Sequence, residues 1–161
     1  MTQLASLTAF IENNLPARAR IPFTSDMDDI TLVPFTKSLG HGQLCTQVRK
    51  YTAFLRWDAW PYRQLNPDLV FSLVEAWLAD NGGDLRQRLA PDAPAVDVEV
   101  DDENEVAWLE ISLPLVDPIT LVEDENGPIP RGGKRYQLEK PEIWVAQAHQ
   151  LHCQVMPWRA P

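Results

Sequence analysis

The stretch that decides the fold class is VDVEVDDENEVAWLEISLPL, residues 96–115. Val96, Val98 and Val100 alternate with acidic residues, and a second alternating run extends from Ala107 to Leu115. Such alternation is typical of a strand that buries one face, and two runs around a short polar turn predict an antiparallel hairpin. We expect one face of this hairpin to lie in the core. The pattern ends at Asp117-Pro118, and residues 119–122 are a candidate for a further strand segment.

A second alternating stretch lies closer to the N-terminus. Within residues 43–60, apolar side chains occupy every second position at Tyr51, Ala53, Leu55 and Trp57. This pattern predicts a strand that ends at Pro61. Residues 29–35 are a candidate short strand, since Pro22 and Pro34 limit its length. Gly40 and Gly42 predict a turn between these two strands.

Two amphipathic helices are expected. The stronger one begins after Asn66-Pro67-Asp68, which combines an N-cap residue, a first-turn proline and an acidic side chain. Its apolar stripe consists of Leu69, Val70, Leu73, Val74, Trp77 and Leu78. Asn81-Gly82-Gly83 is expected to end it. A shorter helix, with Thr2 as N-cap and Pro16 after its end, is predicted from the spacing of Leu4, Leu7, Ile11 and Leu15.

Together these elements predict an α+β fold, in which an antiparallel β-sheet carries two main α-helices packed on one face. The length of 161 residues is usual for one domain, so we expect residues 1–161 to form a single domain. Asn126-Gly127, two prolines and Gly132-Gly133 predict a loop-rich segment around residues 124–141. Residues 143–155 then suit a last strand, with a helix over 146–150 as the alternative, and a short C-terminal tail follows.

Charge and composition disfavour several classes of protein. The formal net charge is −9 and the basic residues are scattered, which argues against direct binding of nucleic acid. No stretch approaches the roughly 20 apolar residues of a membrane-spanning helix, and residues 1–10 lack the pattern of a signal peptide. Cys45 and Cys153 form no CxxC pair, so we expect two reduced thiols in a cytoplasmic protein. The acidic run 101–105 is expected to be a solvated turn.

The sequence contains no GxGxxG, GxxxxGK[ST], HExxH, GxSxG or EF-hand signature. His149, His152 and Cys153 are candidate zinc ligands, which would need His41 and Cys45 to complete the site. On a helix, His149 and Cys153 would share a face at a spacing of four residues, whereas on a strand they would lie about 13 Å apart, too far for one metal. Neither cysteine lies at an expected helix N-terminus that would favour a thiolate. We therefore predict no catalytic residue, no metal, no cofactor and no enzymatic activity.

Aromatic and basic residues outside the expected core are candidates for protein contacts. Trp108 shares its strand face with Glu110 and Ser112, opposite the leucine face, so it suits either an interface or a second packing layer. The other candidate interface residues are Arg131, Arg135, Tyr136 and Trp144. The Trp108 face and residues 128–136 are a candidate pair of patches for a head-to-tail interface between copies.

Several short segments resemble the R-type tail completion proteins of contractile-tailed bacteriophages. These are Lys50-Tyr51-Thr52, Asn66-Pro67-Asp68, Val74-Glu75-Ala76-Trp77-Leu78, residues 106–115, Thr120-Leu121-Val122-Glu123 and Asn126-Gly127. The resemblance covers residues 45–127. It implies an α+β fold and a structural role similar to that of tail terminators, which cap the tail tube or sheath at its head-proximal end. Terminators of this type commonly assemble as hexameric rings, and the resemblance carries over no catalytic residue.

The partners that the resemblance implies are further copies of the chain in a ring, and tail tube, sheath or connector proteins, without direct contact to nucleic acid or membrane. The implied location is the bacterial cytoplasm and, for a functional phage protein, the virion tail. An adaptor or assembly factor of another contractile system is the alternative, and the neighbouring genes would distinguish it. A small metal-dependent enzyme is the third possibility, and bound zinc or loss of stability on chelation would favour it.

Overall fold

The computed structural model describes residues 2–139. Its elements follow the order α1 (Gln3–Asn14), a 3-10 turn (Ala17–Ala19), β1 (Thr24–Gly40), β2 (Gln43–Trp60), α2 (Asp68–Asn81), α3 (Gly83–Leu89), β3 (Ala95–Asp101), β4 (Val106–Glu123), β5 (Ile129–Arg131) and β6 (Lys134–Leu138). The predicted α+β class with an antiparallel sheet is confirmed, as are the strand over residues 43–60 and the hairpin of β3 and β4.

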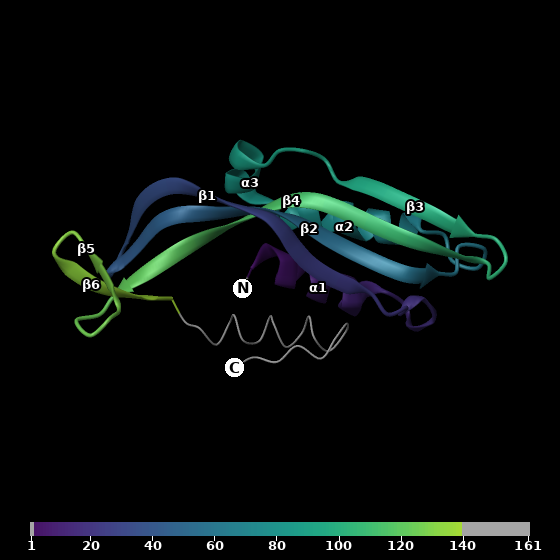
Figure 1. Ribbon diagram of the computed structural model, residues 1–161, viewed down its shortest axis with the longest axis horizontal. Helices are drawn as coiled ribbons and strands as arrows, with labels where there is room; N and C mark the ends of the chain where they lie inside the picture. Colours follow the sequence, from purple (N-terminus) through teal and green to yellow (C-terminus); the bar gives the residue numbers. More distant parts are fainter. Residues whose placement is uncertain (1, 140–161) are drawn as a thin grey trace.

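One curved sheet forms the length of the molecule (Figure 1). Its strand order is β1-β2-β4-β6-β5, and β3 also pairs with β4. All the pairings are antiparallel. β3 lies beside the first part of β4, and β6 beside its last residues, so residues 113–120 of β4 pair with β2 alone. The β3–β4 turn and the β5–β6 hairpin therefore lie at opposite ends of the molecule.

β1 is much longer than the short strand predicted over residues 29–35. Pro34 does not end it, because β1 is an edge strand and needs no N–H donor on its free side. The register with β2 shifts after Asp28, Pro34 and Ser38, and Asp29 takes a positive φ of 54° at the first shift. Such bulges add extra residues to one strand while it stays paired with a neighbouring strand that has none. The predicted turn at residues 40–42 is confirmed.

β4 also continues beyond its predicted end at Asp117-Pro118. Pro118 lies opposite Val48 of β2, in the part of β4 that has no strand on its other side. The missing N–H therefore breaks no ladder. The Asp117 carboxylate is buried, but it accepts a hydrogen bond of 2.7 Å from the Gln3 amide of α1. Both residues that interrupt the pattern are thus accommodated inside one strand.

Helix α1 is held at its N-terminus by side chains from three parts of the chain. The amide of Gln3 donates to Asp117, that of Leu4 to the Tyr51 hydroxyl, and that of Ala5 to the Thr2 side chain. The Thr2 bond confirms the predicted N-cap. The first amides of a helix have no partner within it. Because sheet residues satisfy two of them, α1 can begin only where β2 and β4 lie together.

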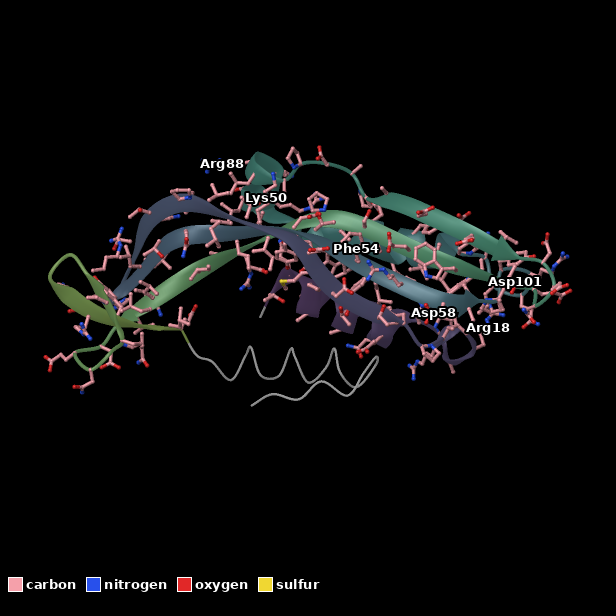
Figure 2. The ribbon with its side chains drawn as sticks, in the orientation of Figure 1. Arg18, Lys50, Phe54, Asp58, Arg88 and Asp101 are labelled. Atoms are coloured by element: carbon pink, nitrogen blue, oxygen red, sulfur yellow. The ribbon has the colours of Figure 1, made fainter. Side chains whose placement is uncertain are left out.

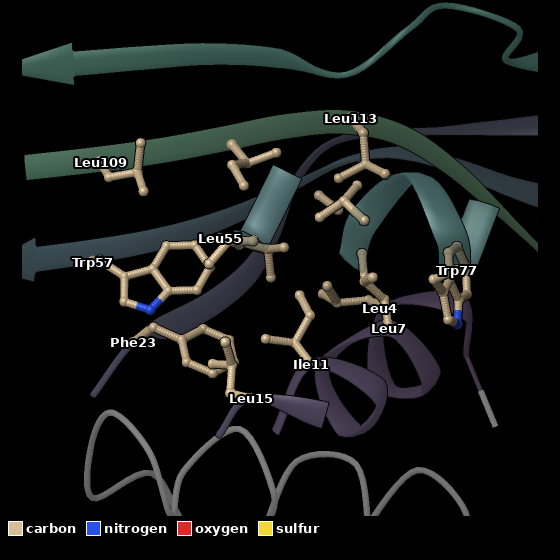
Figure 3. Close-up of a cluster of buried hydrophobic side chains, with 14 of the residues drawn as sticks. Leu4, Leu7, Ile11, Leu15, Phe23, Leu55, Trp57, Trp77, Leu109 and Leu113 are labelled. Atoms are coloured by element: carbon tan, nitrogen blue, oxygen red, sulfur yellow. The ribbon is translucent and has the colours of Figure 1, made fainter. Parts of the chain in front are cut away.

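The core fills the space between the sheet and helices α1 and α2 (Figure 3). Tyr51, Ala53, Leu55 and Trp57 of β2 are at most 1% exposed, as their alternation predicted. The Trp57 ring stacks on Phe23 with 4.8 Å between centroids and meets Trp60 edge-on at 5.9 Å. Helix α2 contributes Val70, Val74 and Trp77. The Trp77 indole also donates to Ser6 of α1, which joins the two helices.

Three features of the structure differ from the prediction. Gly83 has a positive φ of 75°, as expected at a helix end, but helix α3 begins there. Residues 124–141 are not simply loop-rich, because 129–131 and 134–138 form a hairpin around Gly132-Gly133. The valines of β3 lie on the same sheet face as the core, but Val96, Val98 and Val100 are 45%, 49% and 53% exposed. Helix α1 packs on β1 and β4 and donates a hydrogen bond to Tyr51 of β2, and α3 packs on β4, so these helices leave β3 largely uncovered.

Candidate assembly surfaces

Three exposed regions are candidates for protein contacts. The first is the open sheet face, the side of β1, β2 and β4 that faces away from α1 and α2 (Figure 2). Arg56 lies at its centre, where its guanidinium pairs with Asp26 of β1 at 2.7 Å and with Glu110 of β4. The same guanidinium lies 4.6 Å from the Phe54 ring centroid. These cross-strand pairs fix the side chains of the face without covering them.

Trp108 belongs to this open sheet face. It is half-buried, directly opposite Glu99 of β3, and it alternates with buried Ala107 and Leu109. The prediction that Trp108 points away from the leucine face is confirmed by this burial pattern. An indole with acidic neighbours on an open sheet face presents apolar area and negative charge together, and this combination suits a partner surface with basic and aromatic side chains.

The second region is the β3 edge, residues 95–101, which includes Asp97, Glu99 and Asp101. All seven residues are exposed. β3 pairs with β4 in an unbroken register from Ala95 to Asp101, and within residues 2–139 no strand pairs with its other side. The turn that follows is solvated, as predicted, and the Asp101 carboxylate caps it by accepting from Asn104. These hydrogen bonds lower the pKa of Asp101 below its usual value.

The third region is the distal hairpin, residues 129–138, which comprises β5 and β6. Arg131, Arg135 and Tyr136, all predicted as interface residues, lie on it. Arg131 and Arg135 are exposed, and Tyr136 is half-buried between Ile129 and Glu123. The Arg135 side chain donates to the Gly127 carbonyl at 2.9 Å, so it also holds the hairpin in place.

The base of the distal hairpin depends on close contact between two backbones. A Cβ atom added to Gly127 would lie 2.2 Å from the Tyr136 carbonyl oxygen, a distance that no side chain allows. The Asp124 amide donates to the Arg135 carbonyl nearby. Gly127 was predicted to belong to a turn, and the structure shows that it also lets β6 pass over that turn.

A buried polar group joins the sheet to α1 between the two ends of the molecule. Asp117 is 3.5 Å from Arg49 and accepts from Gln3. Burial, and then the negative charge of Asp117, raise the pKa of Tyr51 above its ordinary value. Gln3 extends the group, since its side chain accepts from the Val116 amide and donates to the Asn81 and Gly82 carbonyls. This group fixes the end of α2 and the middle of β4 relative to α1.

The structure does not bring all the predicted interface residues together. Trp108 lies beside β3, whereas Arg131, Arg135 and Tyr136 lie on the distal hairpin at the other end of the molecule (Figure 1). Trp144 lies outside the described residues. The exposed valines of β3 were missed as surface residues because their alternation also fits a core strand. The number of expected helices was the available signal, since two helices cannot cover every strand of a broad sheet.

The candidate metal ligands do not form a group in the described part of the chain. His41 lies in the turn between β1 and β2 and Cys45 is buried in β2, while His149, His152 and Cys153 lie outside residues 2–139. In the described range, no three His, Cys, Asp or Glu side chains are placed to share a metal ion. In that same range no helix is both long and apolar enough to cross a bilayer.

The exposed edge, open sheet face and projecting hairpin define a small α+β protein whose candidate functional features are surfaces for contact with other proteins. Comparison with protein families agrees with this class. The sequence model of the P2 phage tail completion protein R (GpR) family matches residues 1–141. The chain belongs to this family, a family of structural phage tail proteins, and the match extends beyond the range 45–127 in which the resemblance was noticed.

A curated relative also comes from a phage. The chain is 23% identical over 141 residues to an uncharacterized 19.2 kDa protein from the rep-hol intergenic region of Haemophilus phage HP1 (strain HP1c1). The aligned part covers 88% of this chain and 84% of that relative. The family and this relative together support a role in phage tail completion.

Proposed function

We propose that this protein completes the phage tail by assembling into a ring that caps or joins the tail at its head-proximal end. The ring is hexameric in this proposal, as in the tail terminators that the sequence resembles. Its other partners are tail tube, sheath or connector proteins. Assembly takes place in the cytoplasm of the bacterial host, and the finished ring remains in the virion tail.

The observation that carries the proposal is the separation of two complementary patches. Trp108 has Glu99 and Glu110 as neighbours on the open sheet face, and the basic side chains Arg131 and Arg135 lie on the distal hairpin. The patches lie at opposite ends of one chain, so one copy cannot join its own two patches (Figure 1). Two different patches that meet between copies form a heterologous interface, and such an interface generates a ring when its rotation closes.

The first experiment measures particle mass by light scattering after size exclusion, over a range of protein concentrations. We expect the wild-type protein to approach a hexamer as its concentration rises. Trp108→Ala damages one patch and Arg131→Glu the other, so each variant alone should remain monomeric at concentrations where the wild type assembles. Arg18→Glu makes the same charge change at an exposed position outside both patches and should assemble normally.

Mixing the two variants tests the head-to-tail arrangement itself. A Trp108→Ala subunit keeps an intact hairpin, and an Arg131→Glu subunit keeps an intact Trp108 face. An equimolar mixture should therefore form a heterodimer through one intact interface, but no ring. Assembly of either variant into full rings would show that the interface is elsewhere. A wild-type protein that stays monomeric at every concentration would instead favour an adaptor role.

A further inference from the structure

We propose that the β3 edge is a docking site for an extended segment of another protein, which adds to the sheet as a new strand and alternates basic with apolar side chains. The inference rests on the proposed assembly role and names the chemistry of a partner in it. It concerns the free backbone of β3, whereas the ring interface uses the side chain of Trp108, with Glu99 beside it, and the distal hairpin.

The β3 edge lacks most of the devices that prevent strand pairing. Edge strands are usually protected by bulges, prolines, charged side chains, especially lysine, or a covering element, and the charged residues of β3 are all acidic. β1, the edge strand on the other side of the sheet, has three register shifts, Pro34 and Lys37. β3 has a continuous register, no proline and no lysine, and each of its residues is exposed. In such an edge, alternate residues direct their N–H and C=O groups outward, ready for another strand.

The two faces of β3 differ in chemistry, and this difference indicates the side-chain pattern of the partner. Val96, Val98 and Val100 are about half exposed on the face toward the helices, while Asp97, Glu99 and Asp101 occupy the other face. A strand added alongside would place its side chains next to these residues in the same alternation. Apolar side chains would cover the valines, and basic side chains would pair with the carboxylates.

A second copy of β3 does not fit as the occupant. Two copies of β3 side by side would place like charges next to each other across the interface, which destabilises a strand pair. Within residues 2–139, the strands of this chain do not offer a free edge that alternates basic and apolar residues. β6, the most basic strand, is already paired on both sides, by β4 and β5. Residues 140–161 contain one lysine and one arginine, at positions 140 and 159, so their sequence does not alternate basic with apolar residues either. The occupant that fits is therefore a segment of a different protein.

The experiment uses the intact protein and an acetylated peptide of alternating lysine and valine, as long as β3, with a fluorescent label. Anisotropy should show saturable binding, and amide exchange followed by NMR should show added protection in residues 95–101. The Asp97→Lys/Glu99→Lys variant should bind this peptide about tenfold more weakly and gain binding to a glutamate–valine peptide. Asp102→Lys/Glu103→Lys, the same charge change in the turn, should alter the affinity less than about twofold.

A second peptide separates strand addition from simple charge attraction. It carries N-methyl groups on the amides that would donate to β3, so it keeps every charge but cannot form the ladder. This peptide should not bind. Equal binding of the methylated peptide, absence of saturable binding, or an unchanged affinity in the Asp97→Lys/Glu99→Lys variant would each overturn the proposal.

A variant on the valine face of β3 distinguishes this inference from ring formation, because Val98 lies on the face opposite Trp108 and Glu99. If Val98→Asp alters the particle mass of the protein alone while the peptide fails to bind the wild type, the β3 edge is occupied by another copy and the assignment to a different protein is wrong. If the ring fails to form but the peptide binds with the expected charge dependence, the docking site stands and the ring proposal falls.

Discussion

The same two strands support two very different halves of this molecule. The helix-covered half contains residues 51–60 of β2 and 106–115 of β4, and the distal arm contains residues 43–50, 116–123 and their neighbours in β1, β5 and β6. In the covered half, every second β2 residue from Tyr51 to Trp57 is at most 1% exposed. In the distal arm, Ile30, Leu32, Leu39 and Leu138 are 44% to 54% exposed.

The difference teaches that strand pairing and core formation can be separated along one sheet. Hydrogen bonds between β2 and β4 continue from one end to the other, but the helices cover only part of that length (Figure 1). Stability should come mostly from burial in the covered half, since apolar burial is the dominant favourable term in folding. The distal arm remains available to carry contact surfaces.

The largest expected effect comes from the same substitution made in both halves. Leu55→Ala removes a fully buried side chain and should lower the free energy of unfolding by about 2–5 kcal/mol. Leu32→Ala removes a side chain that is 53% exposed on the distal arm. It should change the free energy of unfolding by less than about 0.5 kcal/mol. Urea unfolding followed by tryptophan fluorescence measures both. Similar losses in the two variants would show that the halves share one core.

An intermediate effect concerns the junction between the halves, where Tyr51 is buried beside Asp117. Its pKa is raised in the folded protein, so the folded state favours the protonated phenol. The resulting stability is fully present below the unfolded tyrosine pKa of about 10 and is lost as the pH rises above it, by up to about 1.4 kcal/mol per pH unit. Unfolding measured between pH 8 and pH 11 should show this decline.

The matched variant for this measurement is Tyr51→Phe, which removes the titrating group and the hydrogen bond to the Leu4 amide. It should be about 1 kcal/mol less stable than the wild type at neutral pH. Its stability should fall less steeply than that of the wild type above pH 10. Parallel curves for the two proteins would mean that other groups cause the alkaline loss.

A small effect on global stability is expected at Gly127. Alanine there would drive a Cβ atom into the Tyr136 carbonyl, so the distal hairpin should detach. Because the hairpin lies outside the covered half, the free energy of unfolding should change by less than about 1 kcal/mol, while amide exchange in residues 129–138 should rise sharply. Asn126→Ala, at the exposed neighbouring position, is the control and should leave the exchange unchanged. Cooperative loss of the whole fold would contradict this separation of the halves.

The covered half could be predicted from the sequence because the spacing of its apolar residues shows which side chains are buried. The alternation of residues 51–57 and the spacing of Val70, Val74 and Trp77 record which side chains face the core. The distal arm shows a weaker pattern, because most residues of its β1, β5 and β6 segments are exposed, although Cys45, Val48, Val116 and Leu121 of β2 and β4 are buried. Pro34 and Pro118 therefore predicted strand ends, although each lies where no ladder hydrogen bond is lost.

The candidate surfaces were predictable only in part, for the same reason. Trp108 stood out because an indole on the polar side of a strand breaks the pattern, and Arg131, Arg135 and Tyr136 stood out by their position between glycines and prolines. The valines of β3 did not stand out, because the sequence does not tell whether a helix reaches them. The exposure of these valines depends on the positions of α1 and α2, which are set by the tertiary structure.

The hydrogen bond between the Gln3 amide and Asp117 has a consequence for the synthesis of the protein. It joins residues 114 positions apart in the sequence. At about 5–20 residues per second, the ribosome needs roughly 6–23 seconds to add the residues between them. The β1–β2 hairpin consists of neighbouring strands and can form earlier. The apolar side chains of the first helix therefore cannot dock against the middle of β4 until that strand emerges from the exit tunnel.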